Sequence, residues 1–307
     1  MDLHQIENII AIDREHSISK AAEKLFLTQS ALNQQLLRLE KELGIPLFER
    51  HKHGMVPTYA GNIYLATARQ MIDMKEQTYR IIRDIGEENI GEISISYTPE
   101  RGSLMFSHIY PIFHAKYPNI TFRVCEARGK KMEQLLLQKE VTLACTAYET
   151  GSQKPDFEFQ AMSEELIVLG LPASHPLAYL AGSQSWETFP EIDLKLLRHE
   201  KFTMCSRETI IRSMVNDAFE AAGFQPHILF ESSSTLTVVN MVRNQVSPAF
   251  FPQSYVERNA PIVYFSISPR RSWMRSVTYL KGTYLTKPEK YFIELVSQYH
   301  RGELGAG

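Results

Sequence analysis

This sequence has little cysteine, no strong excess of charge of one sign, and no hydrophobic run long enough to cross a membrane. Its 307 residues include 33 Lys and Arg against 35 Asp and Glu, a formal net charge of −2. Nucleic-acid-binding domains are usually basic, so the overall charge gives no sign of such a partner. The first residues, MDLHQIENIIAIDREH, are acidic where a secretory signal needs cations. We therefore expect a cytoplasmic protein that does not enter the membrane.

The three cysteines, Cys125, Cys145 and Cys205, are far apart and odd in number. This pattern favours reduced thiols over a disulfide framework or a zinc site. A redox-sensing thiol is the alternative, but cysteine buried in apolar surroundings is favoured. His51 and His53 invite a metal interpretation, yet no third ligand is close in the sequence, so we expect no metal site.

The motifs of common enzyme classes are missing as well. The chain has no Gly-rich phosphate loop, no Gly-x-Ser-x-Gly and no cluster of metal ligands. Ser17 and Lys20 have a Ser-x-x-Lys spacing, but their place before a helix indicates that the hydroxyls of this stretch are helix caps. We expect no catalytic residue and no cofactor.

The most informative stretch that is present runs over residues 19–50, SKAAEKLFLTQSALNQQLLRLEKELGIPLFER. Apolar residues recur there at helical spacing in two runs, separated by a short break at Phe26 to Thr28. Thr28 can accept a backbone N–H from the first turn of the second helix, and Gly44 followed by Pro46 ends that helix. The pattern predicts two helices joined by a tight turn.

The second of these helices has a polar face near its N-terminal end, opposite its leucines. The face consists of Gln29, Ser30, Asn33 and Gln34. Short and forked hydrogen-bonding side chains in the first turns are typical of a helix that reads base edges in the major groove of DNA. An ordinary solvated face is the alternative, and the residues assign no particular base.

Residues 47–58 predict a short two-stranded wing with a cationic tip. Arg50, His51, Lys52 and His53 lie at this tip, where a phosphate backbone would run. The first 58 residues nevertheless hold seven Lys and Arg against eight Asp and Glu. Any attraction to phosphate must therefore be local, at the wing and at the helix N-termini.

This stretch resembles the winged helix-turn-helix of LysR-type transcriptional regulators. The matching pieces are AAEKL, TQSAL, Arg38-Leu39-Glu40, ELGIPLFER, and Thr58 with Gly61. The resemblance implies that residues 1–58 bind double-stranded promoter DNA through Thr28, Gln29, Ser30, Asn33, Gln34, Arg38, Arg50, His51, Lys52 and His53. Ser30, Asn33 and Gln34 stand where the family often has Pro, Ser and Arg, which leaves the base contacts open.

Residues 58–85 predict one long helix, since they contain no proline and a single glycine. An apolar seam follows one side of it at spacings of three and four: Ala60, Ile63, Thr67, Met71, Met74, Thr78, Ile81 and Ile85. Such a seam either packs on the protein's own body or pairs with a second copy. In the family this is the dimerisation helix. The resemblance therefore implies a dimer or a dimer of dimers, with residues 59–90 as linker helix and hinge.

From Gly91 onward strands alternate with helices, which predicts parallel sheets covered on both sides. The expected strands are 92–97, 120–125, 143–147 and 166–171, and the expected helices are 104–117, interrupted near Pro111, and 131–138. The pieces GEISIS, KYPNI, EELIVLGLPASHPL and FESSSTLTVVNMV resemble the effector-binding domain of LysR-type regulators, an α/β fold of two subdomains similar to type 2 periplasmic binding proteins. The resemblance implies an effector-binding domain at 91–303, with subdomain I at 91–163 and 268–303 and subdomain II at 164–267. A last helix, 288–300, would return to subdomain I.

Three loops are candidate contacts for a small-molecule effector of unknown identity, because ligands of α/β folds sit at the carboxyl ends of strands. The candidates are Thr98-Pro99-Glu100, Arg128-Gly129, and Thr203-Met204. The resemblance implies a ligand-facing hydroxyl at Thr98 and a second one at position 129, where this chain has glycine. The alternative is that Thr98, Ser206 and Ser234 are simply helix caps.

The sequence thus predicts a LysR-type DNA-binding transcriptional regulator modulated by a small molecule, and no enzyme. The alternative is a cytoplasmic small-molecule-binding protein of solute-binding fold without a regulatory DNA role, since the C-terminal half alone would suit it. The missing signal peptide and the winged helix favour the regulator.

Overall fold

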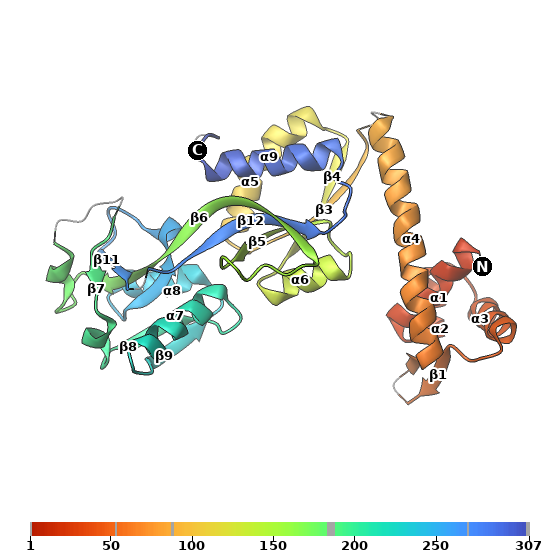
Figure 1. Ribbon diagram of the computed structural model, residues 1–307, viewed down its shortest axis with the longest axis horizontal. Helices are drawn as coiled ribbons and strands as arrows, with labels where there is room; N and C mark the ends of the chain where they lie inside the picture. Colours follow the sequence, from red (N-terminus) through yellow and green to blue (C-terminus); the bar gives the residue numbers. More distant parts are fainter. Residues whose placement is uncertain (1, 53, 87–88, 183–187, 269, 305–307) are drawn as a thin grey trace. The chain divides into compact units, whose positions relative to one another are not determined.

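The computed structural model describes residues 2–52, 54–86, 89–182, 188–268 and 270–304 (Figure 1). The chain divides into two compact units, Met1–Glu88 and Asn89–Gly307. We call them the first unit and the second unit.

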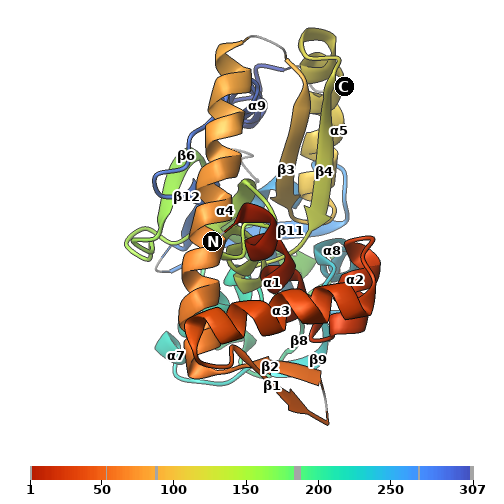
Figure 2. The ribbon, with the colours of Figure 1, turned by 90° about the vertical axis from the view of Figure 1, so that its right-hand side faces the viewer.

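The first unit begins with three helices, followed by a hairpin and a long helix (Figure 2). Its elements are α1 (Leu3–Glu15), α2 (Ile18–Lys24), α3 (Gln29–Leu43), β1 (Phe48–His51), β2 (Gly54–Pro57) and α4 (Tyr59–Ile85). Strands β1 and β2 pair antiparallel. The predicted helix-turn-helix and wing are confirmed, and the structural elements end close to where the sequence places them.

Local capping explains these helix ends. The Ser17 hydroxyl accepts the Lys20 N–H at 3.3 Å, and the Thr58 hydroxyl accepts the Gly61 N–H at 3.0 Å. Gly44 ends α3 with φ of 74°, a conformation that costs glycine little. The core that joins the helices is made of isoleucines and leucines from α1, α3 and α4: Ile6, Ile9, Ile12, Leu32, Leu36, Leu39 and Leu65.

Helix α4 has one buried and one exposed side. Tyr64, Leu65 and Ala68 are buried in the core of the first unit. Farther along, Lys75 donates to Glu7 of α1 at 2.8 Å, and Arg69 pairs with Asp13 of α1. The predicted seam lies on the other side: Ile63, Thr67, Met71, Met74 and Thr78 are exposed, with Met74 at 68%. These five residues do not pack on the core of the first unit, whereas Ala60 of the seam does.

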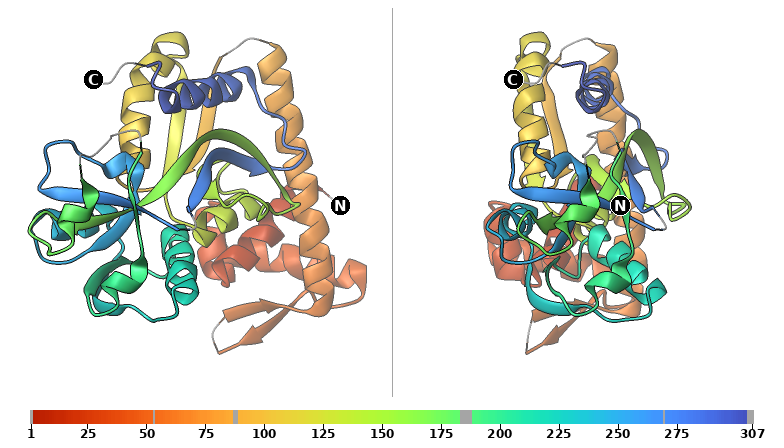
Figure 3. Two further views of the ribbon diagram at one scale, coloured as in Figure 1. Left: turned by 60° about the vertical axis from the view of Figure 1, so that its left-hand side comes forward. Right: turned by 90° about the vertical axis from the view of Figure 1, so that its left-hand side faces the viewer.

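The second unit is an α/β structure whose sheet is joined in the middle by one long strand (Figure 3). Its helices are α5 (Arg101–Lys116), α6 (Lys130–Leu137), α7 (Ile210–Ala221), α8 (Thr235–Arg243) and α9 (Lys287–His300), with short 3-10 turns η1 (Ala178–Ala181), η2 (Leu194–Leu197) and η3 (Gln253–Tyr255). Its strands are β3 (Gly91–Tyr97), β4 (Ile120–Glu126), β5 (Leu143–Tyr148), β6 (Phe157–Pro172), β7 (Glu191–Ile192), β8 (Lys201–Cys205), β9 (His227–Ser232), β10 (Ala249–Pro252), β11 (Ile262–Ile267) and β12 (Ser272–Leu280).

Strand β6 divides this sheet into two halves. Its residues 157–166 pair with β12, which continues through β5 and β3 to β4; we call this half I. Its residues 167–172 pair with β10 and β11, and β10 continues through β8 to β9; we call this half II. Because β6 is one strand of 16 residues, the two halves are joined by continuous backbone.

The prediction of parallel sheets holds for only some of the strand pairs. Strand β3 runs parallel to β4 and β5, and β8 runs parallel to β9 and β10. Strand β12 is antiparallel to β5 and β6, and β6 is antiparallel to β10 and β11. These antiparallel pairs join segments that are far apart in the chain, and the alternation of strands and helices carries no information on them.

Helices α5 and α9 test two further predictions, the interruption near Pro111 and the return of the last helix. Helix α5 is continuous through Pro111, so the predicted interruption is wrong; Ile109 and Phe113 on either side of the proline are fully buried, and this packing stabilises the helix against the proline. Helix α9 packs on α5 in the core of half I through Phe292 and Val296. The predicted return of the last helix is confirmed.

Candidate DNA interface and effector site

Helix α3 presents the predicted polar face to solvent. Gln29, Ser30, Gln34 and Arg38 are exposed, whereas the leucines of the opposite side are buried. The Thr28 hydroxyl accepts the Ala31 N–H at 3.2 Å and lies 3.3 Å from the Ser30 hydroxyl, so it caps the helix. The cap leaves a pair of hydroxyls beside the positive end of the helix dipole. This end of α3 can therefore receive phosphate while the next turn faces base edges.

Asn33 has a hydrogen-bond partner in the wing. Arg50 Nη2 of the wing donates a hydrogen bond to Asn33 Oδ1 at 3.0 Å. Asn33, predicted to face base edges, and Arg50, predicted to hold phosphate, are thus joined by one hydrogen bond. Spacing could not reveal this pair, because it joins residues 17 apart in two different elements.

The wing is held firmly against α3 and α4. Glu40 Oε1 accepts the backbone N–H of Leu47 at 2.7 Å and of Phe48 at 3.2 Å. On the other side, the Thr58 hydroxyl donates to the Pro46 carbonyl at 2.8 Å, and the Thr58 N–H donates to the Leu47 carbonyl at 2.9 Å. The base of the wing is therefore fixed relative to the polar face of α3.

The wing tip carries the remaining predicted cations. His51 Nε2 lies 3.3 Å from Glu49 Oε2, and Lys52 is exposed. His53 lies outside the described residues. Among the residues that the structure does describe, no group of three His, Cys, Asp or Glu could hold a metal ion. None of the helices formed by the described residues is long and apolar enough to span a membrane.

Phe26 is a surface residue that the sequence analysis missed. It sits in the turn between α2 and α3 with φ of 55°, a conformation uncommon for residues other than glycine, and its exposed fraction is 97%. A fully exposed phenylalanine two residues before the cap of α3 offers an apolar surface beside the polar face. A sequence signal was present, since an aromatic residue in a two-helix turn has no helix to pack on.

In the second unit, the side chains of the three candidate effector loops differ in their exposure to solvent. Thr203 is fully buried and its hydroxyl lies 2.6 Å from that of Ser247, while Met204 is 2% exposed in the core of half II. These two side chains are core residues. Thr98 and Pro99, after β3, are partly exposed. The hydroxyls of Thr209 and Ser234 cap α7 and α8, so the cap alternative is confirmed for Ser234.

Glu100 connects the two halves of the sheet. Its Oε2 accepts the Tyr255 hydroxyl at 3.0 Å and the backbone N–H of Leu236 at 3.3 Å, both from half II. Its Oε1 lies 3.8 Å from Arg128 Nη2 of half I. Burial, then the neighbouring Glu100 carboxylate, raises the pKa of Tyr255. Two of the predicted residues, Glu100 and Arg128, are thus brought together.

Gly129 marks a second close approach between the halves. It has φ of 46°, and a Cβ added there would lie 2.8 Å from the Glu208 carbonyl oxygen in half II. Any side chain would need backbone movement at this contact. The glycine, in place of the hydroxyl residue that the resemblance implies, is therefore explained by packing between the halves.

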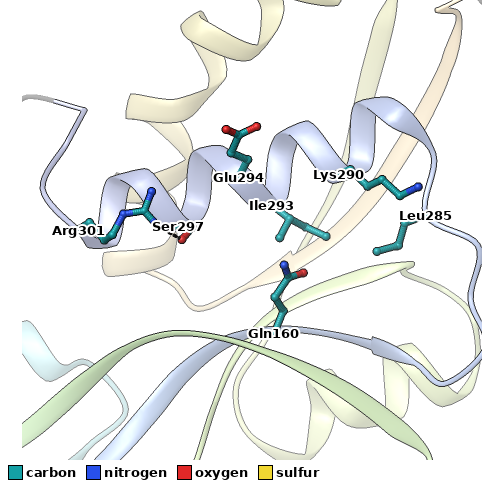
Figure 4. Close-up of a pocket in the computed structure, with 7 residues that line it drawn as sticks. All are labelled: Gln160, Leu285, Lys290, Ile293, Glu294, Ser297 and Arg301. Atoms are coloured by element: carbon teal, nitrogen blue, oxygen red, sulfur yellow. Dashed lines mark hydrogen bonds between the residues drawn. The ribbon is translucent and has the colours of Figure 1, made fainter.

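A separate pocket of about 240 Å³ opens between α9 and the strands of half I (Figure 4). Its lining residues are Gln160, Leu285, Lys290, Ile293, Glu294, Ser297 and Arg301. Arg301 Nη1 donates to the Ser297 hydroxyl at 2.6 Å across one end. None of the predicted effector residues lines this pocket.

Comparison with known families decides the assignment of both units. Residues 3–62 match the model of the bacterial regulatory helix-turn-helix protein, lysR family, and residues 86–301 match that of the LysR substrate binding domain. The chain belongs to the LysR family. It is a DNA-binding transcriptional regulator of that family, and the resemblance inferred from its motifs is confirmed. The match over residues 3–62 rules against a solute-binding protein without a DNA role.

Relatives of similar length support this assignment to the LysR family. The HTH-type transcriptional regulator BsdA of Bacillus subtilis (strain 168) is 25% identical over 300 residues, which cover 96% of this chain and 100% of BsdA. A full-length OxyR variant from Pseudomonas aeruginosa has the same fold, with a TM-score of 0.68, 21% identity and coverage of 98% and 95% of the two chains. CbnR, solved in complex with its target DNA, matches with a TM-score of 0.56, 19% identity and coverage of 97% and 99%.

Proposed function

We propose that this LysR-family regulator reads double-stranded promoter DNA with the exposed polar face of α3. The observation that carries the proposal is the hydrogen bond from Arg50 to Asn33, at 3.0 Å, which ties a wing cation to a groove-facing amide. A guanidinium held in this way can meet a phosphate and orient the amide for a base edge in the same step.

Each residue of this surface has a proposed role. Gln29, Ser30 and Gln34 meet base edges in the major groove, and the cationic wing tip with Arg38 contacts phosphate. Thr28 caps α3 and keeps the first N–H groups of this helix directed at the phosphate backbone of the DNA. Phe26 contributes apolar contact to a sugar or a thymine methyl group.

We propose that α4 pairs with the same helix of a second copy. Ile63, Met74 and Ile82 are 56%, 68% and 57% exposed on a helix of 27 residues. Exposed apolar residues at helical spacing are suited to helix pairing. A dimer, or a dimer of dimers, would present two copies of α3 to the two half-sites of an interrupted palindrome.

The proposed domain organisation follows these roles. Residues 1–58 form the DNA-binding domain, 59–90 the linker helix and hinge, and 91–303 the effector-binding domain. Its subdomains I (91–163, 268–303) and II (164–267) match halves I and II, except that residues 164–166 of β6 pair with β12 in half I. The effector would be a small molecule that acts through Thr98, Pro99, Glu100, Arg128 and Gly129. The function is binding rather than catalysis, and its place is the cytoplasm, where the promoter DNA is.

The experiment compares Arg50→Ala and Asn33→Ala with the parent on a duplex that the protein retains from fragmented genomic DNA. Loss of one phosphate contact should weaken binding to all sequences and reduce the slope of log K against log salt by about 0.9. Asn33→Ala should reduce the preference for the retained duplex over a scrambled one. Because the two residues share a hydrogen bond, the double variant should lose about 1 kcal/mol less than the sum of the single variants.

Arg83→Ala is the matched control, since Arg83 is an exposed arginine near the far end of α4. It should bind both duplexes like the parent. The proposal is wrong if Arg50→Ala and Asn33→Ala both keep the affinity, salt dependence and sequence preference of the parent.

A further inference from the structure

The carboxylate of Glu100 is surrounded by groups that recognise a carboxylate. The Tyr255 hydroxyl and the Leu236 N–H donate to one oxygen at 3.0 and 3.3 Å, and the Arg128 guanidinium lies 3.8 Å from the other. Leu236 is in the first turn of α8, whose positive end favours an anion. These donors come from the loop before α6, from α8 and from η3, which meet at this one side chain.

The backbone at Glu100 is set to reach this position. Glu100 has φ of 66° and ψ of −90°, a region that residues other than glycine rarely occupy. It stands at the N-cap of α5, yet its side chain makes no capping bond to its own helix. The side chain is directed instead at half II, where Arg101 also lies over the Tyr255 ring, 5.4 Å from its centroid.

The contacts of Glu100 cross between the halves beside the Gly129 contact. A Cβ at Gly129 would lie 2.8 Å from the Glu208 carbonyl oxygen, so the backbones of the halves nearly touch there. Away from this contact the halves are joined by two chain crossings, β6 and the connection from β11 to β12, about which they can move. The Glu100 side chain forms hydrogen bonds from half I to half II and therefore opposes separation of the halves.

We propose that Glu100 is a built-in carboxylate ligand that holds the two halves of the effector-binding domain closed, and that a free small carboxylate takes its place once the side chain is removed. The proposal rests on the effector role proposed above for this domain. It implies that the closed state of this regulator needs no added ligand. An effector that opens the halves must then compete with Glu100 for the same three donors.

Hydrogen exchange of the full-length protein, measured by mass spectrometry, tests the proposal. In Glu100→Gly, which removes the carboxylate and suits the positive φ, the peptides that contain Leu236 and Tyr255 should exchange roughly tenfold faster than in the parent. Sodium acetate should restore slow exchange, whereas sodium chloride at the same ionic strength should not. Tyr255→Phe, which removes one donor from the other side, should also accelerate exchange.

The matched control is Glu92→Gly, because Glu92 is an acidic residue of half I whose partner, Arg123 at 2.9 Å, lies in the same half. It should leave the exchange of both peptides unchanged, with or without acetate. Unchanged exchange in Glu100→Gly, or equal rescue by chloride and acetate, would overturn the proposal. The assay contains no DNA, so its failure is distinguishable from a failure of the proposed DNA binding.

Discussion

Gly61 in α4 gives the sharpest test of how the wing is held. It is a buried helical residue, and a Cβ built on it would lie 1.9 Å from the Leu47 carbonyl oxygen. That carbonyl already accepts the Thr58 N–H at 2.9 Å. Because the obstructing atom is backbone, Gly61→Ala must displace either the wing or the start of α4.

Two effects of opposite sign can be weighed for this substitution. Helix propensity favours alanine over glycine by about 1 kcal/mol. Overpacking costs about 1–3 kcal/mol, and loss of the bond from Thr58 to Leu47 costs about 1 kcal/mol more. The expected net result is a loss of about 2 kcal/mol in the free energy of unfolding of the first unit.

Urea denaturation of the full-length protein measures this change, and hydrogen exchange of peptides from the wing locates it. Thr67→Ala is the control, since Thr67 is exposed on the same helix and should change stability by no more than about 0.5 kcal/mol. If Gly61→Ala stabilised the protein, propensity would dominate and the close packing of α4 on the wing would be refuted.

Three further predictions concern pH, thiols and the surface beside α3. Burial, with the nearby Arg275, lowers the pKa of His300 from 6.5 to about 4. Between pH 4 and 6.5 the unfolded chain therefore binds more protons than the folded chain, and the free energy of unfolding should fall as the pH falls through this range. In urea titrations His300→Gln should lose about 3 kcal/mol less of this free energy over the same range than the parent does. An unchanged pH dependence in the variant would contradict the assignment. Burial raises the pKa of Cys145 to about 12 and of Cys205 to about 11, so neither folded thiol should react quickly with an aromatic disulfide reagent; rapid labelling of either would argue for a sensor thiol. Phe26→Ala should leave the melting temperature unchanged and weaken duplex binding several-fold, by about 1 kcal/mol in a titration, whereas equal affinity would remove Phe26 from the interface.

Features that depend on neighbouring residues could be predicted from the sequence. Thr28 marks the start of α3 and Gly44 its end, because a cap and a left-handed glycine act within one helical turn. The polar face followed from the period of the leucines in the same helix. The helix-turn-helix and the wing were therefore predictable, whereas the return of α9 to half I came from the family resemblance.

Features that join distant segments could not be predicted. The antiparallel pairing of β6 with β12 joins Phe157 to Leu280, and nothing in either segment names its partner. The sequence places Glu100 at the end of a strand, but its two partners in half II are 136 and 155 residues away. The bond from Arg50 to Asn33 likewise joins two elements, so the sequence predicts a role for each residue but not their contact.

The central claim is that the outward amides of α3 give this regulator its sequence preference. Its most direct test is the ratio of affinities for a retained duplex and a scrambled duplex of equal length, measured for the parent and for Gln29→Ala/Gln34→Ala. The account predicts that the ratio falls roughly tenfold or more while the salt dependence is kept, because base contacts are lost and phosphate contacts remain. An unchanged ratio would contradict it.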